Sequence, residues 1–248
     1  MKLAPWPYPR WLAHRGAGKL APENTLAAFR LGAAHGYRAF ECDVKLSADG
    51  QPFLLHDSTL QRTTSSSGSA GELPWAELSR LDAGSWHSRQ FAGEPLPTLA
   101  AVAAFIRHNG FTLNIEIKPT PGEEELTGRV VAEQAALLWR DQPVPPLLSS
   151  FRSESLRGAS QTAPQLPRAL LIDSLWPGWF EVAEALGCVA VVSKHTLMDD
   201  ELLARLHGAG MRALCYTVNE PEDALRLLAL GIDGLITDAV DRFSPAAD

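Results

Sequence analysis

The chain has 248 residues, 21% of them charged, and a formal net charge of -7. This length fits a single α/β domain over residues 1–248 with enough sequence to bury a substantial core. The acidic balance, without a cluster of lysine and arginine, excludes a nucleic-acid-binding surface from our expectations and favours a small-molecule substrate.

Cysteine usage and apolar runs indicate the compartment. Cys42, Cys188 and Cys215 are odd in number and lack a C-x-x-C spacing, so we expect neither a disulfide framework nor a zinc site. Reduced thiols suit the cytoplasm. Residues 1–10 contain three prolines and no apolar run, and no later segment approaches 18 uninterrupted apolar residues. We therefore expect a cytoplasmic protein without a membrane span.

A unit recurs along the chain, in which a helix-like run ends in glycine and a short apolar strand follows. Glycine suits the left-handed position that ends a helix. Eight alternating units in about 250 residues predict a (β/α)8 TIM barrel. A doubly wound open sheet is the rival, but no strand is followed by a G-x-G-x-x-G dinucleotide turn. The expected strands are 11–13, 39–44, 113–117, 147–151, 169–172, 189–192, 213–218 and 234–237.

One stretch interrupts this rhythm after the second strand. Residues 45–57 look like a hairpin with Asp49-Gly50 as its turn. The polar and aromatic residues that follow are far more numerous than a strand–helix loop needs. We predict a small insertion or lid at about 58–97 over one mouth of the barrel, with aromatics that chiefly pack onto the barrel.

Charged side chains stand in two of the predicted strand segments. Glu41 and Asp43 point the same way because strand side chains alternate, and so do Glu116 and Lys118. Three acids in strand cores are costly unless something binds them. A hard divalent cation on the carboxylates, with the lysine binding an anion, is the simplest compensation.

Two histidines lie at the same predicted end of the barrel. His14 ends the first strand, and His56 lies on the return arm of the hairpin beside Asp57. Catalytic residues of (β/α)8 enzymes gather at the C-terminal strand ends. A metal, two histidines for proton transfer, and Arg15 with Lys118 on phosphate oxygens together suit phosphodiester cleavage.

Several other polar or aromatic residues have two readings. Phe151 and Tyr216, at strand ends, are read as pocket walls, with core packing as the rival. Glu23 and Asn24 open the first helix, where they either cap it or approach the site. Asp238 is read as a cap for the final turn and is left out of the metal set. His195 is undecided between a structural place and the pocket wall.

Six motifs in order resemble the glycerophosphodiester phosphodiesterase family, in its bacterial cytosolic type. They are His14-Arg15-Gly16, Pro22-Glu23-Asn24-Thr25, Glu41-x-Asp43, His56-Asp57, Glu116-x-Lys118 and the run from Gly234 to Asp238. Each motif alone is weakly specific, but together they cover nearly the whole chain. The family commonly has tryptophan where this chain has Tyr216, and proline near Ala239-Val240, so the head-group preference stays open.

This resemblance implies a barrel enzyme that hydrolyses glycerophosphodiesters to sn-glycerol 3-phosphate and an alcohol. It implies one Mg²⁺ or Ca²⁺ on Glu41, Asp43 and Glu116, with His14 and His56 as the acid–base pair. The attacking group it implies is water or the neighbouring glycerol hydroxyl. The alternatives are a lysophospholipase D-like enzyme with a lipid substrate and a non-catalytic glycerophosphate-binding protein. The sequence leaves open the choice of metal, the role of each histidine, the oligomeric state and the pathway.

Overall fold

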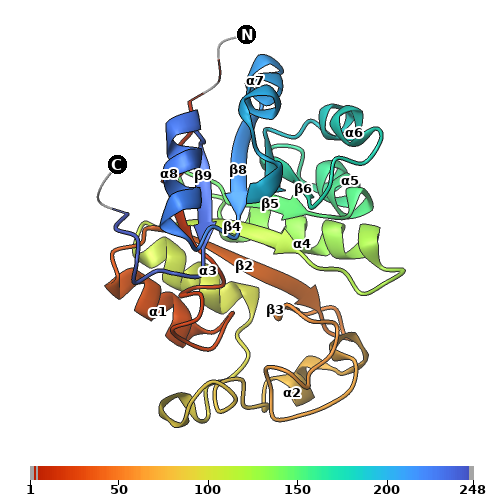
Figure 1. Ribbon diagram of the computed structural model, residues 1–248. Coiled ribbons are helices and arrows are strands. Elements are labelled where there is room, and N and C mark those ends of the chain that lie inside the picture. The colour runs from red at the N-terminus through yellow and green to blue at the C-terminus, as the bar shows by residue number, and fades with distance from the viewer. Residues whose placement is uncertain (1–2, 4, 246–248) are drawn as a thin grey trace.

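The computed structural model describes residues 3 and 5–245, and its centre is a closed barrel of eight parallel strands (Figure 1). The strands pair in the order β1-β9-β8-β7-β6-β5-β4-β2, and pairing of β1 with β2 closes the ring. This confirms the (β/α)8 prediction and excludes the open sheet. The strands are β1 Trp11–Ala13, β2 Ala39–Leu46, β3 Pro52–Leu54, β4 Thr112–Ile117, β5 Leu147–Ser150, β6 Arg168–Ile172, β7 Ala190–Lys194, β8 Arg212–Tyr216 and β9 Gly234–Thr237.

Helices alternate with the barrel strands and cover the outside of the ring (Figure 1). Within the described residues no helix follows β9; instead Phe243 stacks on Trp11, with ring centroids 4.6 Å apart. The α-helices are α1 Leu26–Ala34, α2 Trp75–Leu78, α3 Leu99–His108, α4 Glu124–Leu138, α5 Ser153–Thr162, α6 Trp179–Ala185, α7 Asp200–Gly208 and α8 Pro221–Leu230. Three short 3₁₀ helices are η1 Ala70–Glu72, η2 Arg89–Phe91 and η3 His195–Leu197.

Two apolar layers follow from the alternation of strand side chains. Along β2, Phe40 packs outward with the helices, whereas Ala39 belongs to the cluster inside the barrel. The same alternation directs Glu41 and Asp43 inward. The N-terminal mouth is covered by Tyr8, whose ring packs on the interior cluster and whose hydroxyl donates to the Pro145 carbonyl at 3.0 Å.

The predicted hairpin is present, and β3 runs antiparallel to the end of β2 with Val44 opposite Leu54. Between β3 and α3 the chain forms the insertion, which contains η1, α2 and η2 and lies at the bottom of Figure 1. Its own small core includes Phe53, Leu60 and Leu78, all fully buried. The insertion also reaches the barrel helices, because the Ala27 amide donates to Glu94 Oε1 at 2.9 Å.

The remaining bulk predictions concern thiols and membranes. Cys42, Cys188 and Cys215 are buried, free thiols, as expected from their spacing. Among the described residues, no helix combines the length and apolar character that crossing a bilayer requires.

Candidate active site

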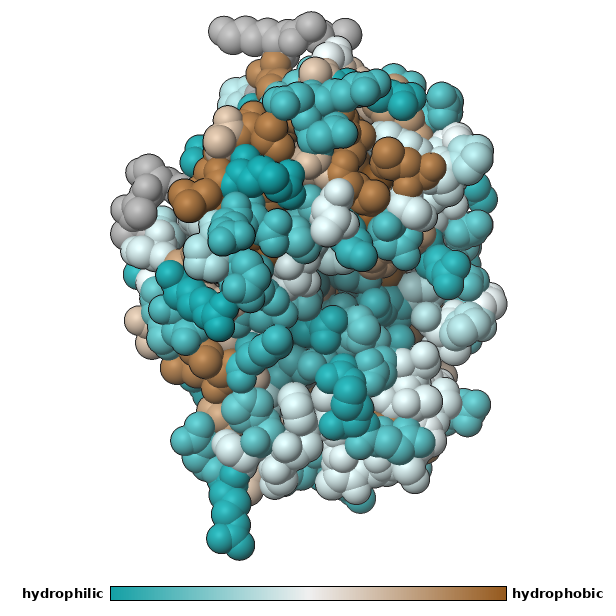
Figure 2. Space-filling view, in the orientation of Figure 1, coloured by the Kyte–Doolittle hydropathy of each residue, from teal (hydrophilic) through white to brown (hydrophobic). Residues whose placement is uncertain are grey.

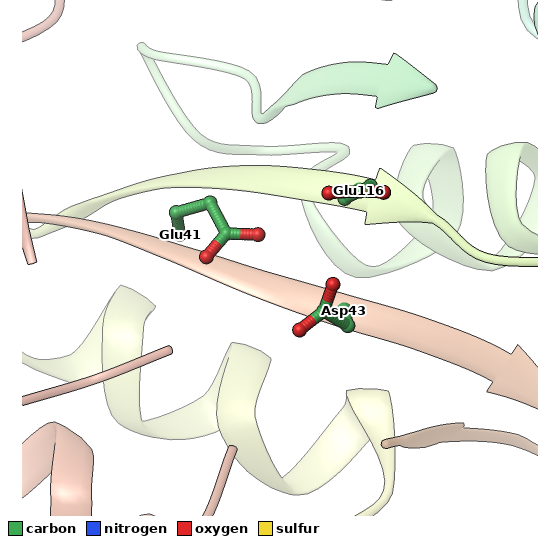
Figure 3. Close-up of side chains that lie close together, drawn as sticks. All are labelled: Glu41, Asp43 and Glu116. Carbon is green, nitrogen blue, oxygen red and sulfur yellow. The ribbon is translucent and has the colours of Figure 1, made fainter. Parts of the chain in front are cut away.

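Three carboxylates from two adjacent strands meet inside the barrel near its C-terminal end. Strand pairing places Asp43 directly opposite Glu116. Glu41 lies two residues before Asp43 on β2, on the same face of the strand. One ligand oxygen from each of the three lies within 4.8 Å of the others. Figure 3 shows the three side chains directed toward a common space between β2 and β4. The sequence prediction that these acids converge is therefore met by the geometry.

Burial makes this cluster electrostatically costly. Desolvation, followed by repulsion from Asp43, raises the pKa of Glu41 to about 8. Desolvation and Asp43 likewise raise the pKa of Glu116 to about 7. Burial opposes ionisation of Asp43 as well, but nearby cations, Arg15 first, outweigh it and lower the Asp43 pKa. Buried Glu41 Oε1 and Asp43 Oδ1 accept no hydrogen bond from the described residues. Oxygen atoms left unpaired in this way are the ligands that a hard divalent cation takes, so the residues fit such an ion.

The β1–α1 loop supplies groups that hold two of these carboxylates. The Arg15 amide donates to Glu41 Oε2 at 3.1 Å, and Arg15 Nε lies 3.1 Å from Asp43 Oδ2. Asn24 donates from Nδ2 to Asp43 Oδ2 at 2.8 Å and accepts from the Asp43 amide. Asn24 therefore approaches the site, whereas the N-cap of α1 is Thr25, whose side chain accepts from the Ala28 amide.

Each predicted catalytic histidine is paired with a carboxylate through Nδ1. His14 Nδ1 lies 2.6 Å from Asp238 Oδ1, and His56 Nδ1 lies 2.7 Å from Asp57 Oδ1. With the carboxylates accepting from Nδ1–H, the Nε2 atoms face the site. His14 Nε2 lies 3.7 Å from Glu41 Oε2.

Both imidazoles have acids and cations nearby, but their net pKa shifts have opposite directions. Burial lowers the pKa of His14, but Asp238 and Glu41 outweigh it, and the net shift is upward. Burial also lowers the pKa of His56, and the cations Arg15 and Lys118 keep the net shift downward. Lys118 Nζ lies 3.1 Å from His56 Nε2 and 3.0 Å from Glu116 Oε1.

Two connected hollows extend from these groups. The middle of Figure 2, between the insertion and helices α6 and α7, is mainly hydrophilic. An inner cavity of about 190 Å³ is lined by both histidines, Arg15, Lys118, Phe151 and Tyr216. Phe151 and Tyr216 both line this cavity, and their rings meet edge to face at 5.8 Å. Tyr216 also packs against the apolar cluster inside the barrel, so both roles considered for it are present. An outer cavity of about 760 Å³ shares His56 and Lys118 and extends to Trp176.

Some residues near the site escaped prediction from sequence. Asp238 was expected to cap a turn, but it faces His14 because β9 pairs with β1. Arg62, in the insertion, contacts Asp57 and Glu23, and no motif pointed to it. The position of Asp238 directly after the last strand, at the end of the barrel where the site lies, was the sequence signal that could have placed it in the site. His195 does not line either hollow, and its Nδ1 lies 3.3 Å from Asp223 Oδ1.

Comparisons with known proteins identify relatives over nearly the full length. The model of the glycerophosphoryl diester phosphodiesterase family matches residues 14–242. The chain is 34% identical to a glycerophosphodiester phosphodiesterase of Caldanaerobacter subterraneus, covering 92% of this chain and 93% of that protein. It is 32% identical to a putative glycerophosphodiester phosphodiesterase of Bacillus subtilis, covering 93% and 94%. The structure of an Oleispira antarctica phosphodiesterase in complex with the product sn-glycerol-3-phosphate matches with a TM-score of 0.89, 33% identity, and coverage of 97% and 98%.

The position of Asp238 depends on a glycine. Gly18 has φ of +55°, and a Cβ there would lie 2.0 Å from the Asp238 carbonyl oxygen. We predict that Gly18→Ala displaces Asp238, lowers the free energy of unfolding in urea by more than about 3 kcal/mol, and changes the imidazole ¹⁵N signals of His14. Gly50→Ala is the control, because Gly50 has φ of +80° but open space around it. It should cost about 1–2 kcal/mol and leave His14 unchanged. Equal losses in both variants would contradict this prediction.

Proposed function

The chain belongs to the glycerophosphoryl diester phosphodiesterase family and is a hydrolase of glycerophosphodiesters, and we propose that it works with one divalent cation and two histidines. The products are sn-glycerol 3-phosphate and an alcohol. One observation carries this proposal: three buried carboxylates, two with unpaired oxygens, lie beside two histidines that are each backed by another carboxylate.

The cation site consists of Glu41, Asp43 and Glu116. Mg²⁺ or Ca²⁺ bound there would neutralise phosphate oxygens as negative charge builds on them. Arg15 and Lys118 supply further positive charge for the phosphate. Both line the inner cavity, and both are held against the acids, Arg15 at Asp43 and Lys118 at Glu116. A substrate phosphate would compete with those carboxylates for the two cationic side chains.

We assign the base to His56 and the acid to His14. The ammonium of Lys118 beside His56 Nε2 keeps the resting ring in its neutral form, so Nε2 carries no proton and its lone pair can serve as the base. Asp238 at Nδ1 and Glu41 on the Nε2 side of the ring both favour the protonated form of His14. A bound cation would offset the upward effect of Glu41 on the pKa of His14, while the effect of the contact with Asp238 would persist.

The proton transfers then balance the bond changes at phosphorus. His56 Nε2 takes the proton of the attacking oxygen, which belongs to water or to the neighbouring glycerol hydroxyl, as that oxygen bonds to phosphorus. The bond from phosphorus to the alcohol oxygen breaks, and His14 Nε2 gives that oxygen its proton. If the glycerol hydroxyl attacks, a cyclic phosphate results, and water opens it in a second step with the histidine roles reversed.

One observation favours a lysophospholipase D-like second candidate. Phe151 and Trp176 line the outer cavity and are 38% and 36% exposed, and Leu175, which precedes Trp176 in the sequence, is 51% exposed. An apolar rim of this kind suits the acyl chain of a lysophospholipid. Comparing turnover of glycerophosphocholine with that of lysophosphatidylcholine separates the candidates, since the proposed enzyme turns over the first substrate faster.

Metal dependence is tested on protein stripped with a chelator. We predict that release of sn-glycerol 3-phosphate from glycerophosphocholine falls at least about 100-fold on stripping, because cation stabilisation of phosphate charge is worth several kcal/mol. Mg²⁺ or Ca²⁺ should restore it. Asp43→Asn should abolish restoration, and Asp141→Asn, at an exposed site far from the cluster, should not. Failure of both metals to restore turnover on any glycerophosphodiester would sink the proposal.

The pH dependence of cation binding follows from the raised pKa values of about 8 for Glu41 and about 7 for Glu116. Below these values the carboxyl groups hold protons that an incoming cation must displace. We predict that affinity rises between about pH 6 and pH 8 and that binding near pH 7 releases protons. Calorimetry in two buffers of different ionisation enthalpy measures that release. Affinity independent of pH over this range would contradict the prediction.

The acid–base roles are tested by substitution. His14→Ala and His56→Ala should each lower kcat by about 100-fold or more, because each removes one proton transfer at the reacting bonds. His108→Ala is the matched control, since His108 lies exposed at the end of α3 and far from both hollows. Near-normal kcat in both variants would leave the assignment untenable.

A further inference from the structure

Arg62, an insertion residue, holds two carboxylates at once. Its Nε and Nη2 donate to Asp57 Oδ2 and Oδ1 at 2.6 and 2.9 Å. Its Nη1 and Nη2 donate to Glu23 Oε2 and Oε1 at 2.7 and 2.8 Å. Four of the five N–H donors of the guanidinium are thus used in two paired contacts, the geometry in which arginine fixes a carboxylate most firmly.

These contacts belong to a longer chain of charges that begins and ends at the candidate metal ligands. On one side, Glu23 accepts from Arg15 Nη1 at 2.9 Å, and Arg15 Nε lies 3.1 Å from Asp43. On the other side, Asp57 pairs with His56, and His56 Nε2 lies 3.1 Å from Lys118 Nζ. Lys118 in turn pairs with Glu116 at 3.0 Å. Arg62 is the link by which the insertion joins this chain.

The link bears directly on the orientation of His56. Asp57 has two carboxylate oxygens, and Arg62 engages both, so the oxygen that faces His56 Nδ1 is fixed in place. A ring fixed at Nδ1 keeps Nε2 directed into the inner cavity. The hydrogen bond from Arg62 also holds the pKa of Asp57 well below its ordinary range. Without Arg62, the 25% exposed Asp57 side chain would be free to turn toward solvent.

A merely structural role for Arg62 is poorly supported, because the insertion is anchored in other ways. Leu60, Leu78 and neighbouring apolar residues form its own buried cluster. Glu94 accepts from the Ala27 amide at the start of α1, and the His87 ring meets the Lys19 carbonyl at 3.0 Å. The Arg62 side chain is 44% exposed, so its removal leaves no buried cavity.

We propose that Arg62 is a positioning residue for the reaction: it fixes Asp57, through Asp57 it orients His56, and through Glu23 and Arg15 it ties that orientation to the metal ligands. This inference rests on the proposed function of His56 in proton transfer. It makes the insertion a working part of the site, since the side chain that aligns the base comes from outside the barrel.

The test compares Arg62→Met, Arg62→Lys and the control Arg80→Met, which changes an exposed arginine of the same insertion. With glycerophosphocholine and the activating cation, Arg62→Met should lower kcat about 10- to 100-fold with less than about a threefold change in KM. Arg62→Lys should recover part of the loss, because lysine restores the charge without the paired geometry. Arg80→Met should match the unaltered protein, and all variants should unfold at similar urea concentrations.

The pH profile separates positioning from simple anchoring. The charges that face His56 come from Asp57, Asp43, Arg15 and Lys118. Removing Arg62 takes away the positive charge that offsets the Asp57 carboxylate, and the more negative Asp57 then favours the protonated form of His56. Because the base must be unprotonated to act, the acid limb of kcat/KM should move to higher pH. A loss of folded protein would scale the profile without moving it.

A double-variant cycle gives the decisive outcome. If Arg62 acts through Asp57, the double variant Arg62→Met with Asp57→Asn should be no slower than Asp57→Asn alone. Fully additive losses, or an unmoved acid limb with kcat near normal in Arg62→Met, overturn the inference. Inactivity of the unaltered protein on glycerophosphodiesters would instead count against the proposed function, so the two failures are distinguishable.

Discussion

Burial of three carboxylates within one barrel is the constraint around which the rest of the site is arranged. Desolvation alone pushes Glu41 and Glu116 toward their protonated forms, and Asp43 adds repulsion. A fold that keeps such groups in its interior must supply positive charge and hydrogen-bond donors from neighbouring segments. The β1–α1 loop does so under backbone strain, since Arg15 and Asn24 adopt positive φ of 51° and 59°. Both strained residues contact these acids, which accounts for the conformation of the loop.

The sequence predicted the parts of this arrangement that depend on periodicity. Strand β4 was expected at 113–117 and spans Thr112–Ile117. The prediction succeeded because alternating apolar and polar residues between a helix-ending glycine and a proline indicate a strand. The shared direction of the Glu41, Asp43 and Glu116 side chains follows from the two-residue repeat of strands and from the parallel register of β2 and β4. The order of the family motifs then supplied the chemistry that the pattern alone left open.

The contacts that escaped prediction depend on how distant segments close on one another. Asp238 meets His14 across 224 positions because the last strand pairs with the first, and a local reading makes it a turn cap. Arg62 reaches Glu23 through an irregular path that no repeat describes. Asp238 has a plausible local role as a turn cap, and only closure of the ring brings it to His14. No motif gives Arg62 a role, and only the course of the insertion brings it to Glu23.

The two histidine–carboxylate pairs therefore differ in what fixes them. His14 and Asp238 stand at the ends of paired barrel strands, so their separation is set by the register of β1 with β9. His56 and Asp57 are neighbours in sequence on the arm that leads into the insertion, and their alignment depends on Arg62 within it. Barrel register is shared by the whole ring and resists local change, whereas a surface insertion tolerates it. On the proposed assignment of acid and base, proton donation would rest on the rigid framework, and proton abstraction would rest on the segment most open to variation.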